Sequence, residues 1–201
     1  MMENASGGIV MGREFELKYA ANPKKLAVLK GRFPNLTQIK MHTTYYDTPD
    51  GCMGNLHWTL RCRMENDRSV CTLKTPAEGF GRNEWEVECE DISAAVGLLV
   101  AEGAPKQLLV FAARGFTENC GARFTRLAAA LELDGASVEL ALDEGVLLGG
   151  GKEMPLCEVE VELKEGSEAA AVAFANVLAA EFNLKPEPRS KVARARILAG
   201  K

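Results

Sequence analysis

The chain has 201 residues, of which 47% are hydrophobic and 26% charged, and its formal net charge is −4. This composition is typical of a single globular domain, and the negative balance disfavours nucleic acid and anionic membranes as partners. No apolar run approaches the roughly 18 residues of a membrane span. Residues 1–11 lack the basic start and apolar core of a secretion signal. We therefore expect a flexible leader over residues 1–11 and one domain over residues 12–201.

Alternation of polar and apolar residues with a period of two dominates the sequence and predicts eight strands. In chain order they are expected over residues 13–19, 38–47, 58–65, 70–75, 82–90, 127–134, 137–144 and 155–164. Helices are expected after Asn22, after Ser93, after Ser167 and over residues 191–198, while residues 103–121 have no clear assignment. These helices are too few for a βαβ fold. The pattern indicates a mainly β (α+β) fold: a closed, eight-stranded antiparallel β-barrel with flanking helices.

Six cysteines are present and none forms a CxxC pair. Four of them alternate with charged residues in strand-like runs, which is typical of buried thiols on an apolar face. The chain is long enough to fold without disulfides. We therefore expect six reduced thiols and a cytoplasmic protein.

Six of the predicted strands carry one apolar face and one charged face, because residues two apart in a strand share a face. Glu14, Glu16 and Lys18 share a face in the first strand, as Arg61 and Arg63 do in the third. A solvated sheet face with cross-strand ion pairs would explain any one of these strands. Across six strands, the pattern favours a barrel whose apolar faces point outward under the helices. The charged side chains would then line a tunnel, with an acidic wall opposite a basic wall.

Such a lumen is suited to a complex of metal and polyphosphate. Carboxylates packed closely together repel one another unless a cation joins them. Oxygen ligands suit Mg²⁺ or Mn²⁺. Arginine binds phosphate oxygens with a two-pronged fork, and lysine binds them as a point charge.

The segment Glu14-Phe15-Glu16-Leu17-Lys18 resembles the ExExK signature of the CYTH domain, the triphosphate tunnel metalloenzymes. Further segments resemble family motifs in the family's order: Tyr45-Tyr46-Asp47-Thr48, Leu60-Arg61-Cys62-Arg63, Thr72-Leu73-Lys74, Arg82-Asn83-Glu84-Trp85-Glu86, the acidic strands 139–143 and 158–163, and Ser190-Lys191. The run looks closest to bacterial inorganic triphosphatases, some of which carry a second, helical domain. The resemblance implies the eight-stranded tunnel and a divalent metal, Mg²⁺ or Mn²⁺.

The resemblance, with the strand phase, also implies roles for individual residues. The expected metal ligands are Glu14, Glu16, Glu158 and Glu160, with Asp143 and Glu162 as second choices. The expected phosphate-binding residues are Lys18, Arg61, Arg63, Lys74, Lys191 and Arg126, with Arg123 as the alternative to Arg126. Glu14, Glu16, Lys18 and Glu160 are the expected catalytic group. Glu84 and Glu86 would either orient the basic residues or bind metal.

The implied reaction is attack of water on a terminal phosphorus, which releases phosphate and diphosphate from inorganic triphosphate or another triphosphate-bearing small molecule. Three alternatives stay open: a class IV adenylate cyclase, a thiamine-triphosphatase, and a non-catalytic module that binds polyphosphate or nucleotide. Trp58 and Trp85 are predicted to point outward, which disfavours a ligand held by stacked rings. The oligomeric state stays open between a monomer and a homodimer.

Overall fold

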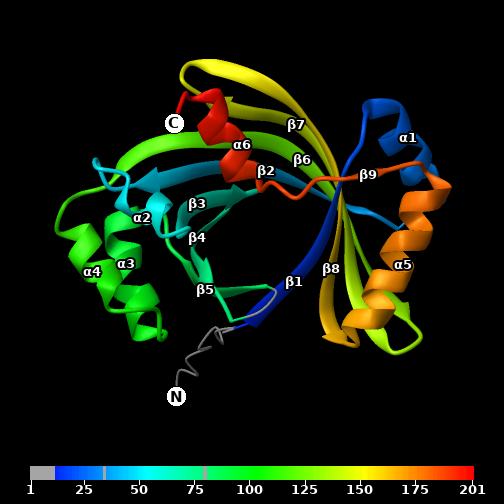
Figure 1. The fold of residues 1–201 in the computed structure, drawn as a ribbon, viewed down its shortest axis with the longest axis horizontal. Coiled ribbons are helices and arrows are strands. Elements are labelled where there is room, and N and C mark those ends of the chain that lie inside the picture. The colour runs from blue at the N-terminus through cyan, green and yellow to red at the C-terminus, as the bar shows by residue number, and fades with distance from the viewer. Residues whose placement is uncertain (1–11, 34, 79–80) are drawn as a thin grey trace.

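Strands dominate the computed structural model, which describes residues 12–33, 35–78 and 81–201. The expected leader over residues 1–11 lies outside these residues. The described strands are β1 (Gly12–Ala20), β2 (Thr37–Asp47), β3 (Thr59–Glu65), β4 (Arg68–Pro76), β5 (Arg82–Glu88), β6 (Thr117–Leu133), β7 (Ala136–Gly149), β8 (Lys152–Gly166) and β9 (Lys185–Pro186). They form one antiparallel sheet in the order β5-β4-β3-β2-β6-β7-β8-β1-β9, and β5 also pairs with β1. This extra pairing closes the first eight strands into the predicted barrel (Figure 1).

Strand β1 closes the barrel because its two halves pair with different neighbours. Its first residues pair with β5, where Glu14 lies opposite Arg82. From Phe15 onward it pairs with β8, where Glu16 lies opposite Glu162 and Lys18 opposite Glu160. The charged face of β1 therefore adjoins charged residues of both neighbouring strands.

All eight predicted strands are present, and the later three are longer than their alternation suggested. Strand β6 begins at Thr117, ten residues before the predicted start, so the unassigned segment contains both a helix and residues 117–121 of this strand. Gly121 interrupts the apolar pattern there. A Cβ atom at Gly121 would lie 2.7 Å from the Thr43 carbonyl oxygen, so the close pairing of β6 with β2 needs a glycine.

The described helices are α1 (Pro23–Arg32), α2 (Cys52–Asn55), α3 (Ile92–Ala101), α4 (Gln107–Ala112), α5 (Glu168–Glu181) and α6 (Lys191–Leu198). Asn22, Ser167 and Ser190 cap α1, α5 and α6 with their side chains. The prediction that Ser93 caps the second helix is wrong, because Asp91 accepts the hydrogen bond from the Ala94 amide at 2.7 Å. Helices α2 and α4 and the short strand β9 were not predicted.

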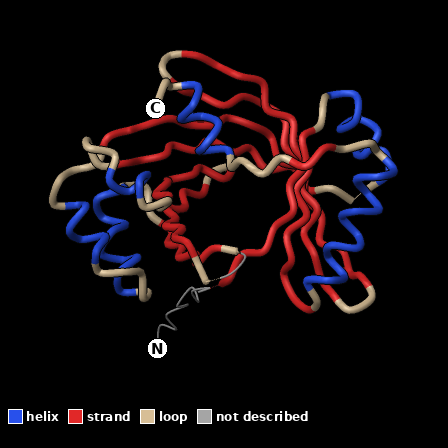
Figure 2. The backbone as a smooth tube through the Cα atoms, viewed as in Figure 1, coloured by secondary structure: helices blue, strands red, loops and turns tan. Residues whose placement is uncertain are grey.

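Two layers of helices cover opposite sides of the barrel, as the tube drawing shows (Figure 2). On one side, Ala171 and Ala175 of α5 pack in a cluster with Val159 and Val161 of β8. On the other, Leu99 of α3 belongs to a cluster with residues of β4 and β5, among them Trp85. Trp58 meets Phe111 of α4 edge to face at 5.5 Å. The apolar strand faces, including both tryptophans, therefore point outward as predicted, and this leaves the charged faces inside.

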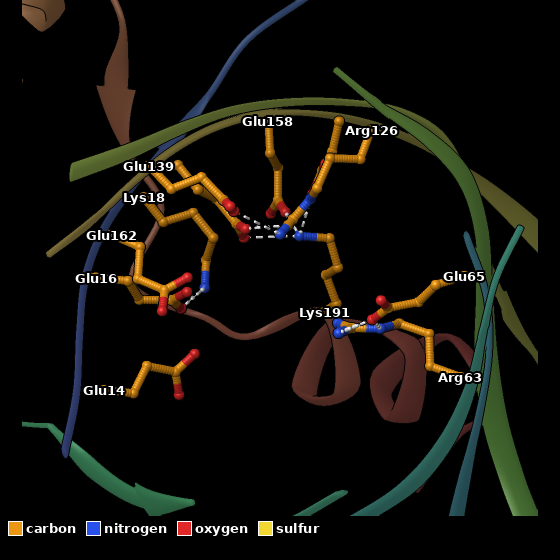
Figure 3. Close-up of polar contacts among 12 residues, drawn as sticks. Glu14, Glu16, Lys18, Arg63, Glu65, Arg126, Glu139, Glu158, Glu162 and Lys191 are labelled. Carbon is orange, nitrogen blue, oxygen red and sulfur yellow. Dashed lines mark hydrogen bonds and ion pairs between the residues drawn. The ribbon is translucent and has the colours of Figure 1, made fainter. Parts of the chain in front are cut away.

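Helix α6 packs on the barrel through a third, smaller cluster. Ala195 of this helix contacts the apolar group that includes Phe124, Leu147 and Leu156. The β7–β8 turn allows a very close approach, because a Cβ atom at Gly149 would lie only 2.3 Å from the Ala195 carbonyl oxygen. This docking places Lys191, the first residue of α6, against the inside of the barrel (Figure 3).

The expectation of six reduced thiols is wrong for Cys62 and Cys71, which form a disulfide. The two residues are direct cross-strand partners on β3 and β4, so their side chains project from the same outward face. Alternation identified that face, but the register that makes them neighbours depends on the turn between the strands. The free cysteines are Cys52, Cys89, Cys120 and Cys157.

Within the described part of the chain, no helix is long and apolar enough to cross a membrane.

Candidate active site in the barrel tunnel

A cavity of about 630 Å³ occupies the inside of the barrel. Its lining includes most of the residues predicted to bind metal or phosphate: Glu14, Glu16, Lys18, Arg61, Arg63, Lys74, Arg126, Glu160, Glu162 and Lys191. These side chains come from five strands and from α6. Figure 3 shows Glu14, Glu16, Lys18, Arg63, Arg126, Glu162 and Lys191 pointing into the barrel. The predicted charged lumen is therefore confirmed.

The predicted separation into an acidic and a basic wall is wrong. Strand β5 pairs with β4, and its Glu84 and Glu86 contact the basic side chains of β3 and β4. Lys74 Nζ lies 2.5 Å from Glu14 Oε1 and 3.2 Å from Glu84 Oε1. Arg61 lies 3.6 Å from Glu84 and 3.5 Å from Glu86. Charges that lose water on burial need partners of opposite sign nearby, so the two signs interleave rather than segregate.

Glu84 and Glu86 thus contact the basic residues, as one of the two predicted roles requires. Glu86 also accepts a hydrogen bond from the Thr72 hydroxyl at 2.9 Å. Burial acts to raise the pKa of Glu86, but Arg61 and this hydrogen bond outweigh it and lower the pKa below its usual value. The carboxylate therefore holds Arg61 in place on the cavity wall.

A buried acidic cluster lies where β7 and β8 meet α6. Carboxylate oxygens of Asp143, Glu158 and Glu160 lie within 4.8 Å of one another. Lys191 Nζ is 2.8 Å from Asp143, 2.5 Å from Glu158 and 2.7 Å from Glu160. Arg126 donates two hydrogen bonds of 2.8 Å to Asp143 and also pairs with Glu160. The ammonium of Lys191 thus occupies the position that the three oxygens define.

The pairing in this cluster controls its protonation. Burial acts to raise the pKa of Glu160, but Lys191 and Arg126 outweigh it and hold the pKa well below its usual range. Burial acts to lower the pKa of Lys191, and the three carboxylates raise it far above its usual value instead. Glu160 and Lys191 are therefore both charged at neutral pH.

Two predicted metal ligands, Asp143 and Glu158, do not line the cavity. Both are fully buried, and Glu158 also pairs with Arg194 of α6. Alternation placed them correctly on the inward face. It could not show that α6 would cover them and supply their counter-ions.

The acidic residues of β1 differ from this cluster because they face the open cavity. In the described residues Glu16 has one ion-pair partner, Lys18, at 3.3 Å. Burial and the neighbouring Glu160 raise the pKa of Glu16. Glu162 lies opposite Glu16 and also lines the cavity. Closely spaced carboxylates that repel one another, with oxygen as the only donor type, fit Mg²⁺ or Mn²⁺.

Arg126 rather than Arg123 is the tunnel arginine. The Arg126 side chain is 12% exposed and lines the cavity, whereas the Arg123 side chain is 60% exposed and pairs with Glu153 at 3.0 Å. The structure therefore resolves the choice between these two residues.

Arg63 also lines the cavity, and its Nε donates to Glu65 at 2.7 Å. Burial and the nearby Arg61 lower the pKa of Arg63.

Several lining residues were not among the expected metal- and phosphate-binding residues. Tyr45 of β2 lies opposite Arg61 and is 4% exposed, and Arg189 lines the cavity from the segment before α6. Arg82 also lines it, and its strand phase was a usable signal because it alternates with Glu84 and Glu86. Nothing comparable marked Arg189, because it lies outside the strands.

This chain belongs to the CYTH domain family, whose sequence model matches residues 12–195. An inorganic triphosphatase of Haemophilus influenzae is 28% identical over an alignment of 208 residues, gaps included. The alignment covers 96% of this chain and 56% of that protein. The chain therefore spans just over half the length of this curated relative.

Solved structures share the fold. A Hippeastrum protein, HpAC1, whose description names an adenylyl cyclase with a dominant triphosphatase activity, superimposes with a TM-score of 0.69 at 18% identity. The match covers 92% of this chain and 96% of that one. The PH1819 protein of Pyrococcus horikoshii gives a TM-score of 0.62 at 23% identity and covers 94% and 99% of the two chains. Both likenesses establish the closed tunnel architecture.

Proposed function

We propose that this protein hydrolyses inorganic triphosphate to phosphate and diphosphate inside the tunnel, with Mg²⁺ or Mn²⁺. The observation that carries the proposal is the composition of the cavity. Carboxylates of β1 and β8 line it together with the basic side chains of Lys18, Arg61, Arg63, Lys74, Arg126 and Lys191, which could bind three phosphates. The Haemophilus influenzae relative, named an inorganic triphosphatase, supports the same reaction.

Arg61, Arg63, Lys74, Arg126 and Lys18 would bind the phosphate chain. Each already contacts a carboxylate, so triphosphate oxygens would compete with those carboxylates for the same donors. Arginine can grip two phosphate oxygens at once. As water attacks the terminal phosphorus, negative charge moves to the leaving diphosphate. Fixed cations stabilise that charge without rearranging, which lowers the barrier.

Glu14, Glu16 and Glu160 would hold the metal. A bound Mg²⁺ or Mn²⁺ would polarise phosphate oxygens and lower the pKa of the attacking water. Asp143 and Glu158 would not bind the metal directly, because they do not line the cavity, whereas Glu160 does. Their role would be to hold Lys191 so that it points at the phosphate chain. Lys191 lines the cavity, which is consistent with that role.

The test is a panel of substrates with the purified protein. Inorganic triphosphate, ATP and thiamine triphosphate are each incubated with Mg²⁺, with Mn²⁺ and with chelator, and both orthophosphate and cyclic AMP are measured. The proposal predicts fast, metal-dependent orthophosphate release from inorganic triphosphate. Cyclic AMP from ATP would assign a cyclase instead. Binding of triphosphate without any product would assign a non-catalytic module.

A further inference from the structure

Arg82 differs from the other basic side chains of the tunnel because it has no acidic partner among the described residues. Every other basic residue that lines the cavity forms an ion pair with a carboxylate: Lys18, Arg61, Arg63, Lys74, Arg126, Lys164, Arg189 and Lys191. Arg82 Nη2 instead donates to three neutral acceptors. These are the His57 carbonyl at 2.8 Å, the Thr59 hydroxyl at 3.2 Å and the Lys74 carbonyl at 3.3 Å.

The register makes this lack of an acidic partner unexpected. Glu14 lies directly opposite Arg82 where β1 pairs with β5. Its carboxylate turns to Lys74 instead, at 2.5 Å. Burial lowers the pKa of Arg82, and the charges of Glu14 and Glu84, which act in the opposite direction, do not offset it. The guanidinium is thus a partly buried charge whose Nε and Nη1 donate no hydrogen bond to the described residues.

Arg82 also stands where the tunnel meets a second cavity of about 400 Å³. Five residues line both cavities: Thr59, Arg82, Ser190, Val192 and Ala193. The second cavity extends from there between the start of β3 and helix α6, and Trp58 forms part of its wall. A ligand in the tunnel could therefore reach into this space past Arg82.

The charge of the second cavity favours an anion. Among the described residues that line it, Arg82 and Arg196 carry a positive charge and none is an aspartate or glutamate. Arg196 already pairs with Asp47 at 2.8 Å. The unmatched charge in this cavity therefore belongs to Arg82. A guanidinium with two nitrogen positions that donate to none of the described residues suits the tetrahedral oxygens of a phosphate group.

We propose that Arg82 and the second cavity form a phosphate subsite next to the triphosphate site. The subsite takes either the fourth phosphate of a longer linear polyphosphate or the orthophosphate that hydrolysis releases. Both carry the same chemical group. The inference rests on the proposed function, because it takes the tunnel itself to hold three phosphates.

The experiment compares the affinities of inorganic triphosphate and inorganic tetraphosphate by calorimetry, with chelator present to prevent turnover. The wild-type protein should bind tetraphosphate about tenfold more tightly, as expected for one further charge-assisted contact. Arg82→Met should bring the ratio of the two affinities close to one while triphosphate affinity changes little. Arg123→Met, which removes an exposed arginine on β6, should keep the wild-type ratio. Arg82→Lys keeps the positive charge and should retain most of the preference for tetraphosphate.

A second titration separates the two sources of phosphate. Orthophosphate is added to protein already saturated with triphosphate. Binding that Arg82→Met abolishes would assign the subsite to released orthophosphate. A tetraphosphate preference without such binding would assign it to longer chains.

The proposal is overturned if neither measurement depends on Arg82, while the melting temperature confirms that the variant is folded. If wild-type protein binds neither triphosphate nor tetraphosphate, the proposed function itself fails. The two failures are therefore distinguishable.

Discussion

The Nζ atom of Lys191 lies 2.7 Å from Oε1 of Glu160, which joins helix α6 to the charged interior of the barrel. The same ammonium contacts Asp143 and Glu158. A lysine thus fills the centre of three carboxylates that would otherwise attract a metal ion. This contact links the position of α6 to the electrostatics of the tunnel.

Replacing Lys191 with methionine should destabilise the protein strongly. The change would leave Asp143, Glu158 and Glu160 buried together without the one ammonium that contacts all three. Removing one partner of a buried ion pair costs about 3–5 kcal/mol. The free energy of unfolding, measured by urea denaturation, should fall by that order. Lys152→Met is the control, because Lys152 is exposed in the β7–β8 turn. Equal losses in the two variants would contradict this account of the cluster.

Glu16→Gln should lower turnover about 100-fold or more without destabilising the fold, because the proposal makes Glu16 a metal ligand. Burial and Glu160 place the pKa of folded Glu16 above its unfolded value. Ionised Glu16 therefore favours the unfolded chain at neutral pH. The stability that this carboxyl group contributes is lost as the pH rises from its pKa in the unfolded chain through its pKa in the folded protein. Removing its charge should leave the melting temperature, measured with chelator, unchanged or higher.

Glu144→Gln is the matched control for that variant, because Glu144 lies exposed on β7. It should keep full turnover. A Glu16→Gln protein that lost stability and activity together would argue that Glu16 is a structural residue.

Lys74→Ala should raise the Michaelis constant for inorganic triphosphate about tenfold, as expected for one lost charge-assisted contact to phosphate. Lys74 is held between Glu14 and Glu84 and points into the cavity. Initial rates at varied triphosphate concentration measure the effect. Lys40→Ala, which changes an exposed lysine of β2, should leave the constant unchanged. An unaltered constant in Lys74→Ala would place Lys74 outside the substrate site.

The Cys62–Cys71 disulfide predicts a specific count of thiols. Unfolded, unreduced protein should react with an alkylating reagent at four cysteines, and reduced protein at all six. Mass spectrometry of the alkylated chain gives both numbers. Six reactive thiols without reductant would show that β3 and β4 are not cross-linked.

The expected cytoplasmic location stays a prediction.

Alternation predicted the barrel and most of its lining because a strand residue's face depends only on its own position in the strand. Glu14, Glu16 and Lys18 could thus be placed in the lumen from β1 alone. Their partners could not, because these depend on register and on which strands meet. The separation of acidic and basic walls failed for this reason: β5 brings Glu84 next to Lys74.

Features formed by distant segments were also beyond the sequence. Helix α6 was predicted as a helix, but its docking depends on the close approach at Gly149, which alternation does not reveal. Lys191 was expected to bind phosphate, and its contacts with Asp143 and Glu158 emerge only when α6 packs on the barrel. The second cavity beside Arg82 likewise arises between β3 and α6, which lie far apart in the chain.

The most direct test of the central claim is the rate of orthophosphate release from inorganic triphosphate by the purified protein. The rate is measured with Mg²⁺ or Mn²⁺ and again after addition of chelator. The account predicts rapid release of one phosphate per triphosphate, with diphosphate as the other product, and loss of that release with chelator. Release that continues in chelator, or no release although triphosphate binds, would contradict it.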